Sequence, residues 1–165
     1  MSECCSTNTC AVESASGAEC PSCGETGTRI DPVTLEALLS SESLGRGLPE
    51  SPRFCANAAC QVVYFDNEAK IVFDERDLTI PVFAKHPGDE NVPVCYCFGH
   101  TMRSIREGQA RDGFRSVSTA ITAEIRAGRC ACEVKNPKGS CCLGDVVRVE
   151  RALEAPSRGG EEATW

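Results

Sequence analysis

The amino-acid sequence predicts an α+β fold in which a small β-hairpin segment precedes a helical hairpin. Three short runs are rich in β-branched and aromatic residues, as strands of a small sheet are, and they cover residues 61–65, 70–73 and 78–83. Later in the chain, Val117, Ile121 and Ile125 recur every four residues, which is typical of the buried face of a helix. A third observation is that 13 of the 165 residues are cysteines, most of them in close pairs. A small core of this kind needs additional stabilisation, and metal ions bound by cysteine pairs can provide it.

Composition divides the chain into four segments. Residues 1–19 and 149–165 are polar and show no hydrophobic period, so we expect a flexible tail containing cysteines at one end and a disordered tail at the other. Residues 20–85 contain the expected strands, and residues 86–148 contain the expected helices. The five later cysteine pairs all fall in these two central segments.

Local signals predict where the helices lie. Asp31 is a suitable N-cap residue and Pro32 suits the first helical position, which indicates a short helix in the first central segment. In the second, we expect helices at residues 100–110 and 116–127, the latter capped by Ser116. Cysteine pairs lie just before and just after this helical hairpin, so its geometry brings both pairs to the same end.

Composition also excludes several classes of function. The net charge of −7 and the isoelectric point near 4.9 argue against nucleic acid as the main partner, because phosphate binding needs a basic face. No run of 18 apolar residues and no secretory signal is present, so we expect a cytoplasmic protein without a membrane span, whose thiols stay reduced. Neither a glycine-rich phosphate loop nor a Ser-His-Asp set is found. We therefore expect a carrier rather than an enzyme.

The first metal site is predicted from two cysteine pairs. Cys20-Pro-Ser-Cys23-Gly has the sequence of a zinc knuckle, whose tight turn directs backbone N–H groups at the sulfurs. Cys55-x4-Cys60 supplies the second half of a tetrahedral site with four thiolates, directly before the expected hairpin. The arrangement is typical of a zinc ribbon or treble clef. Such a closed site leaves zinc no open position, so we expect a structural role.

The second metal site combines the remaining pairs. These are Cys95-x-Cys97, Cys130-x-Cys132 and Cys141-Cys142, with the helical hairpin of just over thirty residues between the first two. This arrangement resembles the bacterioferritin-associated ferredoxin type of [2Fe–2S] domain. Four thiolates can hold a two-iron cluster when each iron takes two of them. A second zinc site is the alternative.

Longer strings extend the likeness to a particular family. Pro93-Val-Cys-Tyr-Cys-Phe-Gly99, Cys130-Ala-Cys-Glu133 and Asn136-Pro-Lys-Gly-Ser-Cys-Cys-Leu-Gly144 resemble the iron–sulfur amino-terminal domain of archaeal-type CopZ copper chaperones, as do Cys20-Pro-Ser-Cys23 and residues 55–65. The resemblance covers roughly residues 20–147. It implies one zinc ion and one [2Fe–2S] cluster side by side, and a role in acquiring or reducing copper for an exporting ATPase. Members of the family also carry a ferredoxin-like copper-binding domain with a Met-x-Cys-x-x-Cys loop, which this sequence lacks.

The choice of cluster ligands stays partly open. The candidates are Cys95, Cys97, one of Cys130 and Cys132, and one of Cys141 and Cys142. We expect Cys132 and Cys142 to complete the set. The reason for Cys142 is that Ser140 can cap a short helix, whose unpaired N–H groups would lie near that thiolate.

Two functions are compatible with these sites. The first is electron transfer or the trafficking or reduction of a soft metal such as copper or mercury, with a metal-exporting ATPase or a redox protein as partner. Cys4, Cys5 and Cys10 in the first tail are then candidate ligands for the soft ion. The alternative is a regulatory or scaffold protein in which two zinc sites are structural and the acidic surface binds a partner.

Overall fold

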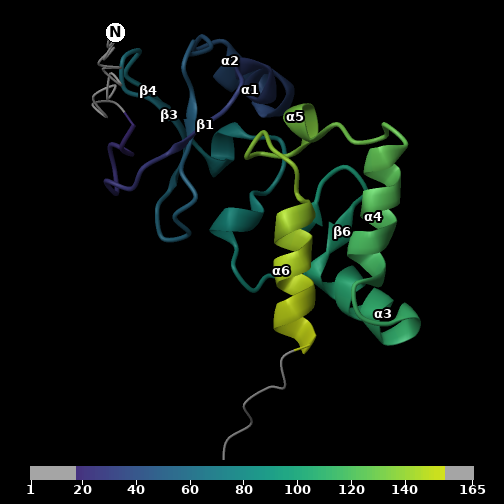
Figure 1. Cartoon of the computed structure of the whole chain (residues 1–165). Helices are drawn as coiled ribbons and strands as arrows, with labels where there is room; N and C mark the ends of the chain where they lie inside the picture. Colours follow the sequence, from purple (N-terminus) through teal and green to yellow (C-terminus); the bar gives the residue numbers. More distant parts are fainter. Residues whose placement is uncertain (1–17, 155–165) are drawn as a thin grey trace, which may run out of the picture.

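The computed structural model describes residues 18–154, which form a sheet region and a helical region packed together (Figure 1). Small antiparallel sheets and helices alternate along the chain, which confirms the predicted α+β class. Cys4, Cys5 and Cys10 lie outside the described residues. Ala18 and Glu19, predicted as part of the first tail, are described, and Glu19 forms a β-bridge with Thr26.

The sheet region is built on four antiparallel strands in the order β1-β2-β3-β4. Their bounds are Thr28–Arg29, Arg53–Phe54, Val62–Asp66 and Ile71–Asp74. The two longest strands, β3 and β4, confirm two of the three predicted runs. Every residue of β3 is buried, because the strand lies inside the sheet and is covered on both sides.

The prediction of a third strand at residues 78–83 was wrong. Glu75–Asp77 and Phe83–Lys85 are turns of 3-10 helix, and between them only Leu78 forms a β-bridge, to Leu39. The Glu75 carboxylate accepts a hydrogen bond from the Val82 N–H at 2.6 Å. The apolar side chains of this run therefore pack against the sheet from a loop.

Two short helices cover the sheet. Helix α1 (Pro32–Leu38) begins as predicted, since the Asp31 side chain accepts a hydrogen bond from the Val33 N–H at 3.0 Å. Helix α2 (Ser41–Leu44) is a single turn capped by Ser40. Residues from α1, β2, β3 and β4 form one core around Leu35, Tyr64 and Phe73.

The helical region contains the hairpin β5-β6 and four helices. Strands β5 and β6 are Pro93–Cys95 and His100–Thr101, and the helices are α3 (Met102–Asp112), α4 (Ser116–Arg126), α5 (Cys132–Lys135) and α6 (Leu143–Glu154). The predicted helices correspond to α3 and α4. Arg115, in a left-handed conformation, precedes α4, so Ser116 is its first residue and not its cap.

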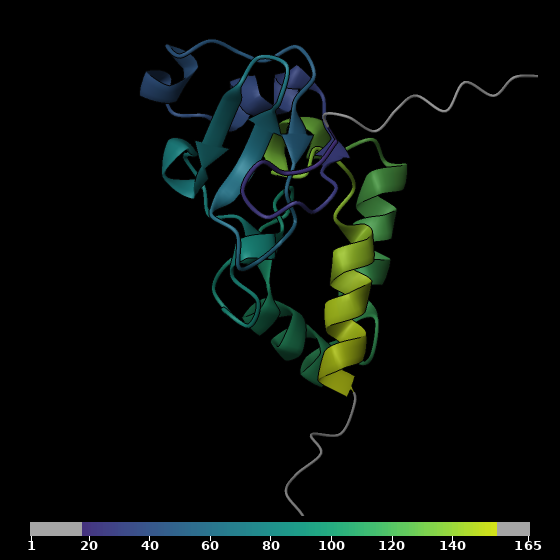
Figure 2. The same ribbon diagram turned by 90° about the vertical axis from the view of Figure 1, so that its left-hand side faces the viewer.

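The predicted boundary of the second tail at residue 149 was wrong. Helix α6 continues to Glu154, and Val149 and Glu150 are buried in it. Val146, Val149 and Leu153 recur at helical spacing and pack with α3 and α4 in the second core. The three long helices thus enclose the end of the molecule away from the sheet (Figure 2).

The two predicted central segments contact each other closely. Helix α5 packs on α1, where the Thr34 hydroxyl donates to the Glu133 carbonyl at 2.7 Å. The buried Tyr64 hydroxyl donates to the Pro137 carbonyl at 2.7 Å. Tyr96 accepts from the Phe83 N–H at 2.8 Å. No helix among residues 18–154 is long and apolar enough to cross a membrane.

Candidate metal centres

The first group of cysteines brings together all four residues predicted as zinc ligands. The sulfurs of Cys20, Cys23, Cys55 and Cys60 lie within 4.8 Å of one another. Cys20 and Cys60 are 3.8 Å apart, and Cys23 and Cys55 are 3.7 Å apart. A tetrahedron with metal–sulfur bonds of about 2.3 Å has sulfur–sulfur edges of about 3.8 Å. The spacing therefore fits a single tetrahedral ion such as zinc.

Backbone geometry holds these sulfurs in place. The Gly24 N–H donates to the Cys20 carbonyl at 2.8 Å, and Gly24 has a φ of 75°, which closes the tight turn predicted for the first pair. The antiparallel pairing of β2 with β3 continues past Phe54 and Tyr64, where the Cys55 N–H donates to the Val63 carbonyl at 2.9 Å. Cys55 therefore lies where the pairing of β2 with β3 ends, and its sulfur faces that of Cys23 in the first turn.

The sulfurs also receive N–H groups, as a thiolate site requires. Burial raises the pKa of Cys20, and the N–H groups of Cys23 and Ser22 oppose that effect. Burial likewise raises the pKa of Cys55, to about 12, against the N–H of Asn57. Cys20, Cys55 and Cys60 are buried and Cys23 is half-buried. Four thiolates this close together need a cation to be stable, and a bound metal ion is the natural one.

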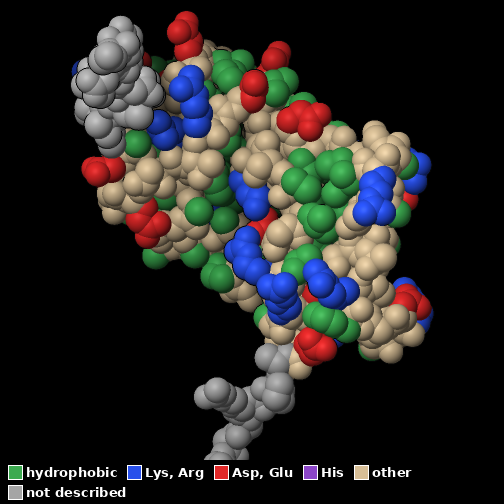
Figure 3. All heavy atoms as spheres, viewed as in Figure 1, with side chains coloured by type: hydrophobic (Ala, Val, Ile, Leu, Met, Phe, Trp, Pro, Cys, Tyr) green, Lys and Arg blue, Asp and Glu red, His purple; other side chains and the backbone are tan. Residues whose placement is uncertain are grey.

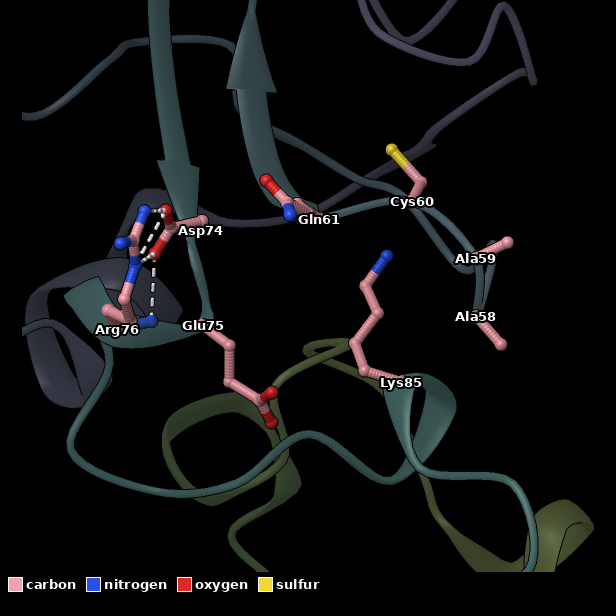
Figure 4. A pocket seen from close by; sticks show the side chains of 8 residues that line it. All are labelled: Ala58, Ala59, Cys60, Gln61, Asp74, Glu75, Arg76 and Lys85. Carbon is pink, nitrogen blue, oxygen red and sulfur yellow. Dashed lines mark hydrogen bonds and ion pairs between the residues drawn. The ribbon is translucent and has the colours of Figure 1, made fainter.

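A positively charged side chain lies beside this group. Lys85 donates from Nζ to the Asn57 carbonyl at 2.8 Å, and its charge favours the thiolate of Cys55. It lines a cavity of about 460 Å³ together with Cys60, Asp74 and Glu75. Figure 4 shows the Lys85 side chain extending from the far wall of this cavity toward the side that carries Cys60. The cavity is polar and lies beside the first group of cysteines.

The second group of cysteines contains Cys97, Cys130 and Cys132, whose sulfurs also lie within 4.8 Å of one another. The distance from Cys97 is 3.9 Å to Cys130 and 3.4 Å to Cys132, and the last two sulfurs are 3.3 Å apart. The Ala131 N–H donates to the Cys97 sulfur at 3.4 Å. Cys97 comes from the turn between β5 and β6, Cys130 comes from the segment between α4 and α5, and Cys132 is the first residue of α5.

Cys95 and Cys142 lie next to this group. Both are buried, at the end of β5 and immediately before α6. Interaction with Cys142 lowers the pKa of Cys95 to about 7, and the same interaction raises the pKa of Cys142. Cys142 also interacts with Cys132, which links the pair to the other three thiols. Five of the six cysteines predicted near the second site thus converge.

The sixth, Cys141, is exposed. Helix α6 begins at Leu143, and the Cys142 carbonyl accepts the N–H groups of Asp145 at 3.0 Å and Val146 at 3.1 Å. Cys142 therefore ends up at the N-terminus of the helix with its side chain in the core, and Cys141 points outward. The predicted cap at Ser140 was wrong by two residues, because the helix starts later.

The surface near the second group is basic although the chain is acidic. Lysine and arginine side chains gather over α6 and its surroundings on the face in Figure 3. Lys138 and Arg148 both pair with the single carboxylate of Asp145. These three residues and Tyr96 line a cavity of about 470 Å³ between the two regions.

The fold and the first cysteine group together define a zinc-binding, cysteine-rich α+β domain. A family described as a zinc binding domain of CopZ matches residues 17–79, which contain all four cysteines of that group. The copper chaperone CopZ of Archaeoglobus fulgidus is 34% identical over 130 residues, which are 79% of this chain and 60% of that protein. The X-ray structure of the A. fulgidus CopZ N-terminal domain superposes with a TM-score of 0.65 at 30% identity and covers 79% of this chain and 96% of that domain.

The chain belongs to the family of CopZ amino-terminal domains. This confirms the resemblance to a CopZ-type domain and the prediction that the protein binds zinc, whereas the [2Fe–2S] part of the resemblance stays a prediction. The chain spans 60% of the length of the curated relative that it matches.

Proposed function

We propose that this domain holds one zinc ion and one [2Fe–2S] cluster, and that it carries electrons or soft metal ions rather than catalysing a reaction on an organic substrate. The proposed ligands are Cys20, Cys23, Cys55 and Cys60 for zinc, and Cys95, Cys97, Cys132 and Cys142 for the cluster. The observation that carries the proposal is the convergence of a second set of thiols beyond the zinc-binding segment.

The zinc ion has a structural role in this proposal. Three of the five buried residues in the surrounding core are cysteines, and only Val62 and Phe65 supply ordinary apolar contacts. Without a cation, this core would consist mainly of thiols that repel one another when ionised. A metal ion converts them into a cross-link between the turn at Cys20 and the strands.

The set proposed for the cluster suits two irons. A [2Fe–2S] cluster needs two pairs of thiolates, one pair for each iron. Cys95 interacts with Cys142, and Cys97 lies 3.4 Å from Cys132, which gives two such pairs. Val94, Ile105, Val117 and Val146 pack around the buried thiols of Cys95, Cys132 and Cys142 and shield them from water, while Cys97 stays half-buried. When bound, the cluster supplies one-electron chemistry, and the protein's part is to position the thiolates and keep the site dry.

Soft-metal trafficking is supported by the thiol chemistry and by the relative. Thiolates select soft ions such as Cu(I), and the matched relative from A. fulgidus is named a copper chaperone. We infer that the partners of this chain are soft metal ions together with a metal-exporting ATPase or a redox protein. The basic surface over α6 lies next to the proposed cluster site and is suited to an acidic face on such a partner.

A second zinc site is the competing hypothesis, and one observation favours it. Cys97, Cys130 and Cys132 form a compact group of three thiols, which could serve zinc with one further ligand. The protein would then be a regulatory or scaffold protein with two structural sites. The two hypotheses differ in metal content and in colour.

Anaerobic purification followed by metal analysis tests the proposal. We expect two iron atoms, two inorganic sulfides and one zinc ion per chain, with absorption in the visible range. Cys95→Ser should abolish iron and colour while zinc remains, because the two sites use separate cysteines; Cys141→Ser is the control and should keep both. A colourless protein with two zinc ions would establish the competing hypothesis instead.

A further inference from the structure

We infer that Cys97, Cys130 and Cys132 form a three-thiolate binding site for Cu(I), which is in use when no cluster is present. This inference rests on the proposed function in one respect: two of its thiols, Cys97 and Cys132, are also proposed cluster ligands. Cys130 belongs only to the three-thiolate site. Because Cu(I) and the cluster both need Cys97 and Cys132, they exclude each other.

The sulfur positions match a trigonal ion. The three distances are 3.3, 3.4 and 3.9 Å. A point in the plane of these sulfurs is about 2.1 Å from each of them, within about 0.2 Å of a typical metal–thiolate bond of about 2.3 Å. Small rotations of the side chains are enough to admit the ion.

The donor set favours Cu(I) over harder ions. Only sulfur atoms belong to this group, with no imidazole or carboxylate among them. Soft thiolate ligands select Cu(I), whereas zinc in a closed site takes four ligands. The next nearest thiols, those of Cys95 and Cys142, interact with each other and fall outside the group of three.

The site is open on one side. Cys132 is buried, whereas Cys97 and Cys130 are half-buried. Cys130 follows the turn at Gly128, which has a φ of 72°, and the exposed Arg129, whose guanidinium pairs with Glu124 on α4. An ion can therefore reach the three sulfurs from the side of Cys130 without opening the core.

Competitive titration of the full-length protein tests the site. Cys4, Cys5 and Cys10 are replaced by Ser in every sample, and the protein is prepared with zinc but without iron. Cu(I) is then titrated anaerobically against bicinchoninate, a coloured Cu(I) chelator. Cys130→Ser should weaken binding of one Cu(I) ion by roughly tenfold or more. Cys141→Ser, which removes an exposed thiol outside the group, should leave the affinity unchanged.

Two further measurements separate this inference from the proposed function. Copper-edge X-ray absorption should give three sulfur neighbours in the parent and two in Cys130→Ser. Iron reconstitution of Cys130→Ser should still yield two irons, and prior loading with one Cu(I) should block reconstitution in the parent. Zinc content and circular dichroism confirm that each variant is folded.

Equal Cu(I) affinity in the parent and in Cys130→Ser would overturn the inference, as would simultaneous binding of Cu(I) and the cluster. Loss of iron in Cys130→Ser would make Cys130 a cluster ligand and would also overturn it. If neither the parent nor any variant binds iron but Cu(I) is bound by three sulfurs, the proposed cluster is ruled out and the Cu(I) site is supported.

Discussion

Glu150 is completely buried on α6, and its carboxylate serves as the cap of another helix. Its Oε1 accepts a hydrogen bond from the Ser118 N–H at 3.0 Å, near the start of α4, which has no side-chain cap of its own. Its Oε2 and the buried Ser116 hydroxyl have no partner among the described residues. A carboxylate at a helix N-terminus is favourable because the helix dipole is positive there.

Replacing Glu150 tests this role. Glu150→Leu should lower the free energy of unfolding by about 1–3 kcal/mol, because it leaves the Ser118 N–H buried and unpaired. Glu150→Gln, which keeps an oxygen acceptor for the Ser118 N–H, should lose less than half as much. Denaturant unfolding of both variants is the measurement, and equal losses would show that the hydrogen bond contributes nothing.

Asp66 gives the molecule a defined response to acid. Burial tends to raise its pKa, but the N–H groups of Ala69, Ser51 and Glu68 hold the pKa below the usual value. A carboxyl with a depressed pKa stabilises the fold above its unfolded pKa of about 3.9, and this stability is lost as pH falls through the folded value. Asp66→Asn should therefore cost about 1–3 kcal/mol at neutral pH, and the difference from the parent should shrink below about pH 4.

The comparison with the parent is essential, because acid also releases metal from thiolates. Metal release acts on both proteins, so it cancels in the difference. A difference that stays constant from pH 7 to pH 3 would contradict the role assigned to Asp66.

Elements whose signals are local could be predicted from sequence, and those that depend on distant contacts could not. The cap at Asp31 predicts α1, and the run of β-branched and aromatic residues at 61–65 predicts β3, which the structure places at Val62–Asp66. Residues 78–83 have the same composition, but the hydrogen bond from Val82 to Glu75 keeps them out of the sheet. The last turns of α6 were missed because Pro and Gly further along suggest a tail, whereas Val149 is held by packing.

The same distinction applies to the metal centres. Both cysteine pairs of the first group are visible in the sequence because each is closed by a short turn. In the second group, Cys142 is buried and Cys141 is exposed because α6 begins at Leu143. The sequence alone does not show at which residue this helix begins. Cys130 and Cys132 share one segment, and the fold brings both to Cys97.

Contact between α3 and α4 depends on a glycine. A Cβ at Gly108 would lie 2.8 Å from Val117 Cγ2, whereas a Cβ at Gly144 on α6 would meet nothing within 4 Å. Gly108→Ala should therefore destabilise the protein by about 1–3 kcal/mol through overpacking. Gly144→Ala should stabilise it by up to about 1 kcal/mol, because alanine favours the helix. Thermal unfolding of the two variants checks both signs, and stabilisation by both would mean that α3 and α4 move apart freely.

At the scale of the whole molecule, the second metal centre is built against the first region. The loop that carries Cys95 and Cys97 also carries Tyr96, which bonds to the Phe83 N–H and to the Pro81 carbonyl at 2.9 Å. The segment after Cys132 is fastened to α1 and β3 by the bonds of Thr34 and Tyr64. A disturbance of the sheet should therefore reach the second centre through these bonds.

Zinc removal from the loaded protein tests this coupling. Chelation should reduce the strand signal in circular dichroism, because the core around Cys20, Cys55 and Cys60 loses its cross-link. The visible absorption should then bleach about 5–30 times faster than in untreated protein, which corresponds to a coupling of about 1–2 kcal/mol. Tyr64→Phe removes the bond to Pro137 but no metal ligand, so chelation should accelerate bleaching less in that variant. An unchanged strand signal would contradict the proposed zinc ligands. A lost strand signal with unchanged bleaching would show instead that the contacts between the two regions do not couple the centres.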